Sequence, residues 1–167
     1  HRWAYSKLQR LFSISQATYL TNLKAFSLPN ERITQLYDGV DLSLYLQGIS
    51  VSDRRLVRAS LGVSQDALAI ALPGRITEAK GHLVWIEALA KLKAWSEVPK
   101  WCGVIIGEAA GVDARPGGFA DQLKARINSL GLHNDIVFAG FRSDLAQCLK
   151  VIDLVCIPSV NEAFGLS

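Results

Sequence analysis

The sequence contains no methionine and no long apolar run. A helix that spans a bilayer needs about 20 consecutive apolar residues, so we expect no transmembrane segment. The charged and aromatic start, HRWAYSKLQR, does not resemble a secretory signal peptide, and a cytoplasmic location is therefore expected. Because methionine is absent and the ending NEAFGLS looks like an unfinished loop, we also expect a piece of a longer protein.

The chain also has few cysteines and a small net charge. Cys102, Cys148 and Cys156 lie in apolar surroundings without metal-site spacing or short-range pairing, so we expect reduced, structural thiols. The formal net charge is only +3 and the cations are dispersed. This balance argues against a nucleic-acid partner but suits a protein that handles an anionic ligand.

Hydrophobic residues are abundant, at 50% of the 167 residues, which is enough for the core of about one domain. From residue 66 onward, short runs rich in Val, Ile and Leu alternate with amphipathic stretches, which predicts an α/β, Rossmann-like parallel sheet flanked by helices. The predicted strands, expected to be buried on both faces, are residues 67–72, 101–107, 135–140 and 153–158. The predicted helices are residues 82–95, 119–132 and 143–152, the last with Ser143 or Asp144 as its N-cap.

The first part of the chain has a different pattern. Residues 10–15 predict a strand and residues 16–26 a helix. Residues 50–63 predict a further helix, with Ser50 or Ser52 as its N-cap and Gly62 at its end. We find no internal repeat.

The loop after the first Rossmann-like strand combines glycine with positive charge. Gly74, Arg75, Lys80 and Gly81 precede a predicted helix whose first N–H groups and dipole favour an anion. Arg75 would contact two phosphate oxygens and Lys80 would add a point charge, which together suit a diphosphate. Two solvated cations beside an ordinary helix start give the same pattern, so the loop alone leaves both interpretations open.

Two familiar phosphate-binding motifs are missing. The loops after the first two Rossmann-like strands contain neither G-x-x-x-x-G-K-[ST] nor G-x-G-x-x-G. This argues against an ATPase and against a nicotinamide-dependent oxidoreductase. In the last loop, Glu162 suits sugar hydroxyls, and the N–H groups near Gly165 and Leu166 suit a phosphate, although a solvated glutamate is the alternative. His82 either faces a ligand or is a surface histidine, and we assign no catalytic role to it or to His133.

Five segments in order resemble one known family. They are YDGVD (37–41), LPGRITEAKGH (72–82), VIIGE (104–108), IVFAGFRSDL (136–145) and VIDLVCIPSVNEAFGLS (151–167). Together they resemble the C-terminal, donor-binding domain of family 4, or group 1, glycosyltransferases, which are retaining enzymes with the GT-B fold. Residues 74–92 and 106–118 are most similar to bacterial members that build lipopolysaccharide or other surface glycans.

The resemblance implies roles for individual residues. Arg75 and Lys80 would hold the donor diphosphate and stabilise the leaving nucleotide, and Glu162 would contact the transferred sugar. The other donor-binding residues implied are Gly74, Gly107, Glu108, Gly140, Phe141, Arg142, Phe164, Gly165 and Leu166. The family's second acid, which contacts the ribose, would fall at position 170, after the last residue, and Asp38 stands where the family often has asparagine.

The resemblance also implies an organisation and partners. Residues 1–36 would end an N-terminal acceptor domain and its crossover, and residues 37–167 would form the donor domain. The partners would be a nucleotide sugar and, through the rest of the acceptor domain, a glycan or lipid-linked glycan at the inner face of the plasma membrane. We expect this piece alone to lack turnover. Because there is no Asp-x-Asp, we expect neither a metal nor another cofactor. A noncatalytic nucleotide-sugar-binding module and a nucleotide-sugar epimerase remain as alternatives.

Overall fold

The computed structural model describes residues 7–26 and 29–160 and divides into two compact units, the first ending at Asp41 and the second beginning at Leu42. In the first unit, β1 (Leu11–Ser13) and β2 (Ile33–Gln35) pair in parallel beside helix α2 (Gln16–Phe26), with the 3₁₀ turn η1 (Asn30–Arg32) before β2. The strand β2 was not predicted, because three residues are too short for a periodic pattern. The assignment of residues 1–36 to an acceptor domain stays a prediction.

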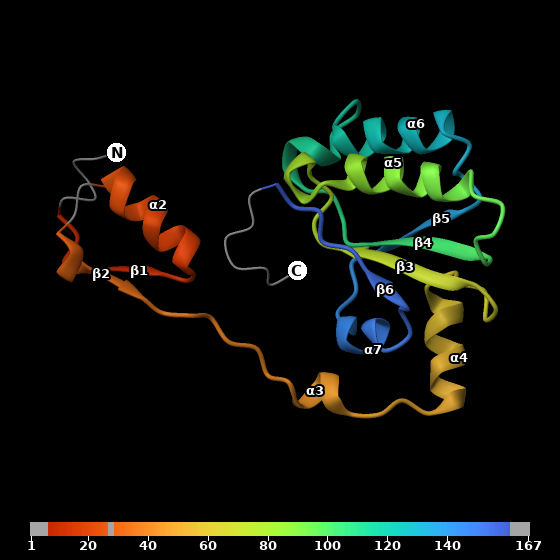
Figure 1. The fold of residues 1–167 in the computed structure, drawn as a ribbon, viewed down its shortest axis with the longest axis horizontal. Coiled ribbons are helices and arrows are strands. Elements are labelled where there is room, and N and C mark those ends of the chain that lie inside the picture. Colours follow the sequence, from red (N-terminus) through yellow and green to blue (C-terminus); the bar gives the residue numbers. More distant parts are fainter. Residues whose placement is uncertain (1–6, 27–28, 161–167) are drawn as a thin grey trace. The chain divides into compact units, whose positions relative to one another are not determined.

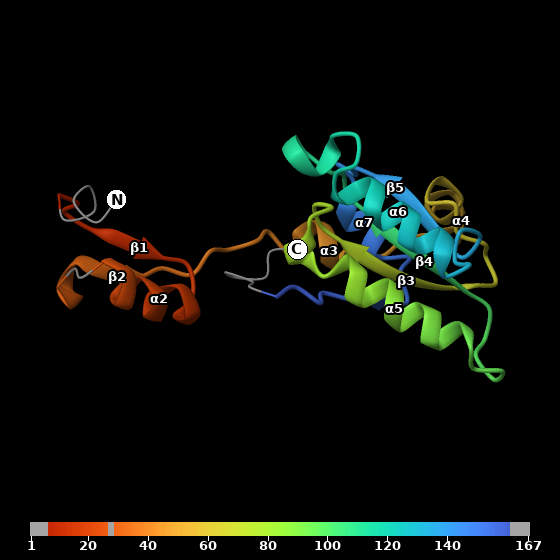
Figure 2. The same cartoon turned by 90° about the horizontal axis from the view of Figure 1, so that it is seen from above.

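The second unit contains a parallel four-stranded sheet in the order β5-β4-β3-β6. Its strands are β3 (Leu68–Pro73), β4 (Trp101–Ile106), β5 (Ile136–Gly140) and β6 (Leu154–Val155). Helices α5 (His82–Lys93) and α6 (Phe119–Ser129) cover one face, and α4 (Val51–Ser60) and α7 (Leu145–Leu149) lie on the other (Figures 1 and 2). The shorter elements are α3 (Ser43–Leu46), η2 (Glu78–Lys80) and η3 (Gly111–Ala114). The predicted α/β class is confirmed.

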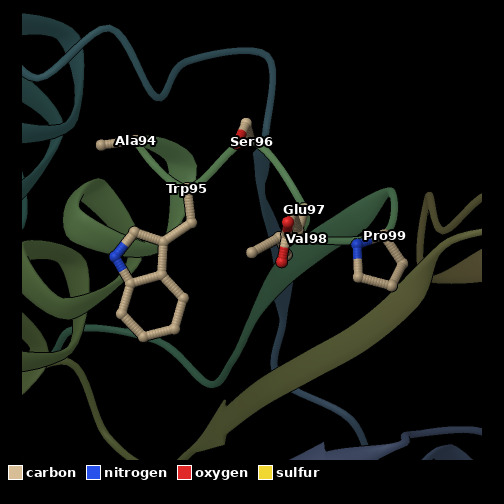
Figure 3. A pocket seen from close by; sticks show the side chains of 6 residues that line it. All are labelled: Ala94, Trp95, Ser96, Glu97, Val98 and Pro99. Carbon is tan, nitrogen blue, oxygen red and sulfur yellow. The ribbon is translucent and has the colours of Figure 1, made fainter.

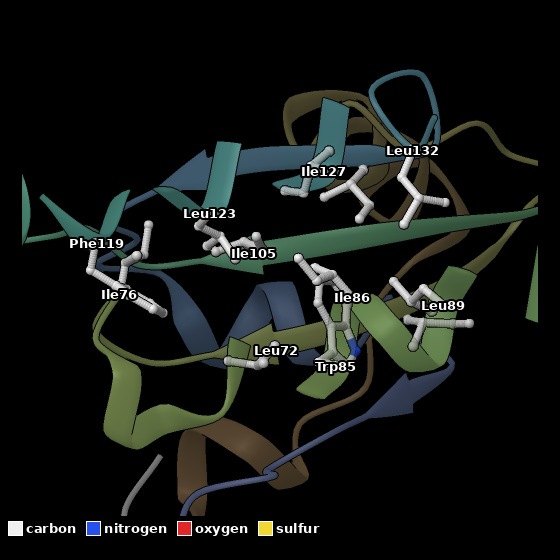
Figure 4. Packing of buried hydrophobic residues seen from close by; sticks show 12 residues of the cluster. Leu72, Ile76, Trp85, Ile86, Leu89, Ile105, Phe119, Leu123, Ile127 and Leu132 are labelled. Carbon is white, nitrogen blue, oxygen red and sulfur yellow. The ribbon is translucent and has the colours of Figure 1, made fainter. Parts of the chain in front are cut away.

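The central strand β3 shows how the sheet separates two cores. Successive side chains of a strand point to opposite faces. Ile70 and Leu72 therefore join Ile86, Ile105 and other residues beneath α5 and α6 (Figure 4). The small side chains of Ala69 and Ala71 pack instead on the α4 and α7 side. Burial on both faces is thus confirmed for β3.

At the sheet edge formed by β6 the prediction fails in part. The strand covers two residues rather than the six expected, and Leu154 and Val155 are 54% and 41% exposed among the described residues. β6 pairs with β3 only, through Ile70 and Ala71. Burial on both faces is therefore wrong for this strand, because on its other side no described strand pairs with it.

The helix α4 carries a buried arginine. The N-cap is Ser50, whose hydroxyl accepts a hydrogen bond from the Asp53 N–H at 3.0 Å, which confirms one of the two predicted caps. Arg58 is only 3% exposed, and its Nη1 donates to the Val151 carbonyl at 2.9 Å. The same nitrogen lies 3.3 Å from the Asp153 carboxylate, which also accepts from the Ala69 N–H at 2.8 Å. Arg58 therefore ties α4 to the beginning of β6.

The cysteines and the lengths of the helices can be compared with the predictions. Cys102, Cys148 and Cys156 are free thiols, as predicted, and burial raises the pKa of Cys102 and of Cys148. In the described part of the chain, no helix combines the length and the apolar character that crossing a bilayer requires.

Candidate functional site

The loops after β3 and β4 meet at the carboxyl edge of the sheet. The Gly74 N–H donates to the Ile106 carbonyl at 2.9 Å, and the Ile76 N–H donates to the Glu108 carbonyl at 3.0 Å. Gly107 has φ +148°, and a Cβ added there would lie 2.1 Å from the Gly74 carbonyl oxygen. Only glycine fits this approach. The two predicted glycines thus bring their loops into direct contact.

The two predicted cations lie differently on this edge. Lys80, at the end of η2, extends its alkyl chain along Gly74, with Cδ 3.6 Å from where a Cβ of residue 74 would stand. Arg75 is exposed, and its side chain has no hydrogen bond or ion pair with the residues that the structure describes. Its five N–H donors are therefore available for an anion.

The end of β5 and the loop after it add a glycine and an exposed aromatic ring. A Cβ at Gly140 would lie 3.6 Å from the Glu108 Oε1, so these two predicted residues are close together. Phe141 is 72% exposed. Arg142 forms a two-pronged pair with Asp144, with Nε and Nη2 each 2.7 Å from a carboxylate oxygen, and Nη2 also donates to the Ser60 Oγ.

This fork changes how Arg142 and Asp144 are interpreted. The hydrogen bonds lower the pKa of Asp144 and raise that of Arg142. Asp144 was a predicted N-cap of α7, and it stands at that position, but its side chain caps no N–H and pairs with Arg142 instead. The guanidinium of Arg142 is thus engaged within the protein, which leaves Phe141 as the exposed side chain of the segment.

The fourth loop reaches the same turn from the other side. The Val160 N–H donates to the Ala79 carbonyl at 3.0 Å. Gly81 has φ +74°, and a Cβ there would lie 2.1 Å from the Pro158 carbonyl oxygen. The start of α5 is therefore more covered than the sequence suggested. The remaining predicted residues of this loop lie outside the described residues; they are Glu162, Phe164, Gly165 and Leu166.

His82 corrects one expectation. It is 0% exposed, so the interpretation as a surface histidine is wrong. Its ring packs edge-on against Phe119 at a centroid distance of 6.3 Å, and its Nδ1 lies 3.3 Å from the Thr77 carbonyl oxygen. Burial, opposed in part by that hydrogen bond, lowers the pKa of His82, and the charge of Lys80 lowers it further.

The structure thus gathers most of the predicted residues on which it reports. The loops that carry Gly74 and Gly107 are joined by hydrogen bonds, and Gly140, the last residue of β5, lies close to Glu108. Lys80 lies along Gly74. Sequence reasoning missed the Thr77 and Ala79 carbonyls, because backbone contacts leave no compositional signal. Within the described ranges, no three His, Cys, Asp or Glu side chains gather as metal ligands would. A metal-free site stays a prediction.

A surface hollow elsewhere has a different character. It is formed by one connection, from α5 to β4, and is lined by Ala94, Trp95, Ser96, Glu97, Val98 and Pro99 (Figure 3). This connection enters the amino end of β4, at the opposite edge of the sheet from the glycine loops. Because ligands of open α/β sheets bind at the carboxyl edge, we do not assign this hollow to the site.

Comparison with known proteins agrees with the predicted family. Residues 53–167 match the model of the family described as "Glycosyl transferases group 1". The chain is 34% identical over 139 residues to a D-inositol 3-phosphate glycosyltransferase of Jonesia denitrificans, covering 81% of this chain but 32% of the relative. The corresponding enzyme of Mycobacterium bovis is 34% identical over 137 residues, with 26% of its length covered. The chain belongs to the group 1 glycosyltransferase family, and it spans about a third or less of these relatives.

Solved structures support the same fold. The Anabaena protein HepE, in complex with UDP and glucose, superimposes with a TM-score of 0.83 at 29% identity, covering 97% of this chain and 41% of HepE. The C-terminal domain of the group 1 protein LpcC from Francisella tularensis gives a TM-score of 0.61 at 30% identity, covering 77% of this chain and 63% of that domain. The prediction of a GT-B glycosyltransferase fold is thereby confirmed.

Proposed function

We propose that this chain is the donor-binding part of a retaining glycosyltransferase that takes its sugar from a uridine diphosphate sugar. The observation that carries the proposal is the pair Arg75 and Lys80. Arg75 is exposed and has no partner among the described residues, and the alkyl chain of Lys80 lies along Gly74, where the loops after β3 and β4 are in contact. The choice of uridine is supported by HepE, whose structures hold UDP, UDP with glucose, or UDP-glucose.

In the proposed reaction, the bond between the anomeric carbon and the diphosphate breaks as the acceptor hydroxyl attacks from the same face. Because attack and departure occur on the same face, the configuration is retained, and the leaving phosphate accepts the hydroxyl proton. Negative charge grows on the diphosphate during this step. Arg75 and Lys80 would stabilise it as fixed cations, in place of a divalent metal. Glu162 would orient the sugar through hydrogen bonds to its hydroxyls.

The biological setting is a proposal of its own. The similarity of residues 74–92 and 106–118 to bacterial surface-glycan enzymes supports an acceptor that is a glycan or a lipid-linked glycan. Such an acceptor implies action at the cytoplasmic face of the membrane, with peripheral association of the whole enzyme. Activity of the whole protein against lipid-linked acceptors, assayed with membranes and with detergent-extracted lipid, tests this setting.

Donor binding is tested by calorimetric titration of the folded chain with UDP, GDP, ADP and NADH. We expect UDP to bind most tightly, and Arg75→Ala and Lys80→Ala each to weaken it about tenfold or more, since a phosphate contact of this kind is worth more than 1.4 kcal/mol. Lys91→Ala, which removes an exposed cation from the far end of α5, is the matched control and should change nothing. No nucleotide binding by a folded chain, or equal binding by all three variants, would overturn the proposal.

A further inference from the structure

Backbone hydrogen bonds and the buried side chain of His82 hold the turn that carries Lys80. The Thr77 carbonyl oxygen accepts from the Lys80 N–H at 3.2 Å and also lies 3.3 Å from the His82 Nδ1. The backbone of Lys80 and the ring of His82 therefore share one acceptor. Through its packing against Phe119, the ring of His82 connects this turn to the core, in which the preceding residue Ile76 is also buried.

The chemistry of that contact fixes the state of the ring. A carbonyl oxygen only accepts, so the Nδ1 of His82 must carry the proton, and the Nε2 is left with a lone pair. The Nε2 is buried and has no hydrogen-bond partner among the described residues. A second proton there would be a buried donor without an acceptor, close to the positive charge of Lys80. Both geometry and burial thus favour one neutral tautomer.

Direct contact between His82 and a substrate is excluded by its burial. Its ring instead lies between the Thr77 carbonyl and Phe119 and connects the turn to the core. We infer that His82 is a positioning residue, which holds the Thr77–Lys80 turn so that the alkyl chain of Lys80 lies over Gly74 and its ammonium is directed to the donor site. The inference rests on the proposed donor site for its consequence in binding, but the positioning itself is a property of the chain without ligand.

Two substitutions separate the hydrogen bond from the volume of the ring. In His82→Asn the amide nitrogen occupies the place of Nδ1 and keeps the donor, whereas His82→Leu fills the space without a donor. Hydrogen exchange of the Lys80 amide, measured without ligand, should accelerate several-fold in His82→Leu and much less in His82→Asn. Equal exchange in the two variants would overturn the inference, whatever the chain binds.

Binding gives the second readout. His82→Leu should weaken UDP binding about three- to tenfold, and His82→Asn should restore most of it. In a Lys80→Ala background, His82→Leu should add little, because residues that act through one another are not additive. A full additional loss in that background would mean a general structural role and would overturn the inference. Failure of the unaltered chain to bind any nucleotide would instead count against the proposed function, with the exchange result still deciding on His82.

Discussion

Arg58 and Arg75 belong to the same unit, but their surroundings differ completely. Arg58 lies beneath the sheet, 3% exposed, where its terminal nitrogens donate to the carbonyls of Val151, Ser64 and Ala67 and pair with Asp153. Arg75 lies at the carboxyl edge, exposed, without a partner for its side chain among the described residues. The guanidinium of Arg58 is bound within the protein, whereas that of Arg75 is available to a ligand.

The difference follows from where backbone carbonyls are left unpaired. Around Arg58, the chain leaves α4, enters β3 and begins β6, so several carbonyls lack a partner within a helix or strand and need a donor. Around Gly74, the loops after β3 and β4 satisfy each other through backbone hydrogen bonds. Arg75 therefore donates to none of the described carbonyls there, and this separates a binding arginine from a structural one.

Removing the structural arginine should have the largest effect. Arg58→Met removes the donor to the Val151 and Ala67 carbonyls and one of the cations beside the Asp153 carboxylate, and we expect the free energy of unfolding to fall by about 3–5 kcal/mol. Urea unfolding followed by circular dichroism measures the change. Arg55→Met, an exposed position on the same helix, is the control and should cost less than about 0.5 kcal/mol. Equal losses in the two variants would show that burial and carbonyl contacts do not make Arg58 a structural residue.

The next largest loss of stability is expected at Gly81, beside the candidate site. Gly81→Ala combines an unfavourable φ of +74° with a clash against the Pro158 carbonyl, and we expect a loss of about 3 kcal/mol in unfolding free energy. Gly117→Ala has nearly the same φ, +73°, but nothing within 4 Å of the new Cβ, so about 1 kcal/mol is expected. Thermal unfolding of the pair measures the clash alone; a difference near zero would show that the 158–160 segment moves away freely.

Elements with a periodic sequence pattern could be predicted, and contacts between distant residues could not. The buried runs of β3 and β4 and the amphipathic helices α5 and α6 are periodic over many residues, so their bounds came within a few residues of the structure. The glycines at 74, 107 and 140 were predicted to belong to the donor site, and they lie at the carboxyl edge of the sheet. In contrast, the exposure of β6, the hydrogen bond of Arg142 to Ser60 and the burial of His82 against Phe119 depend on neighbours distant in sequence. A single sequence carries no local signal for such contacts.

The protonation of His82 should make the stability of the protein depend on pH. Its pKa is lowered in the folded protein, chiefly by burial, so the unfolded chain binds the proton more readily. The free energy of unfolding should therefore be unaffected by His82 above about pH 6.5 and should fall as the pH drops below that value toward the folded pKa. Urea unfolding of the protein and of His82→Asn at pH 7.5 and 5.5 isolates this contribution. A loss on acidification as large in His82→Asn would assign it to other groups.

The smallest effect is expected for an arginine between the two extremes. Arg126 on α6 pairs with Glu87 on α5, with its Nε 2.6 Å from a carboxylate oxygen, but the two side chains are 46% and 42% exposed. Water competes for both charges and salt screens them, so Arg126→Gln should change the unfolding free energy by about 0.2–1 kcal/mol, and less in high salt. Urea unfolding at low and high ionic strength tests this. If the loss approached that of Arg58→Met, pairing rather than burial would be what makes an arginine structural, and the exposed Arg75 would then be distinguished from Arg58 only by its missing partner.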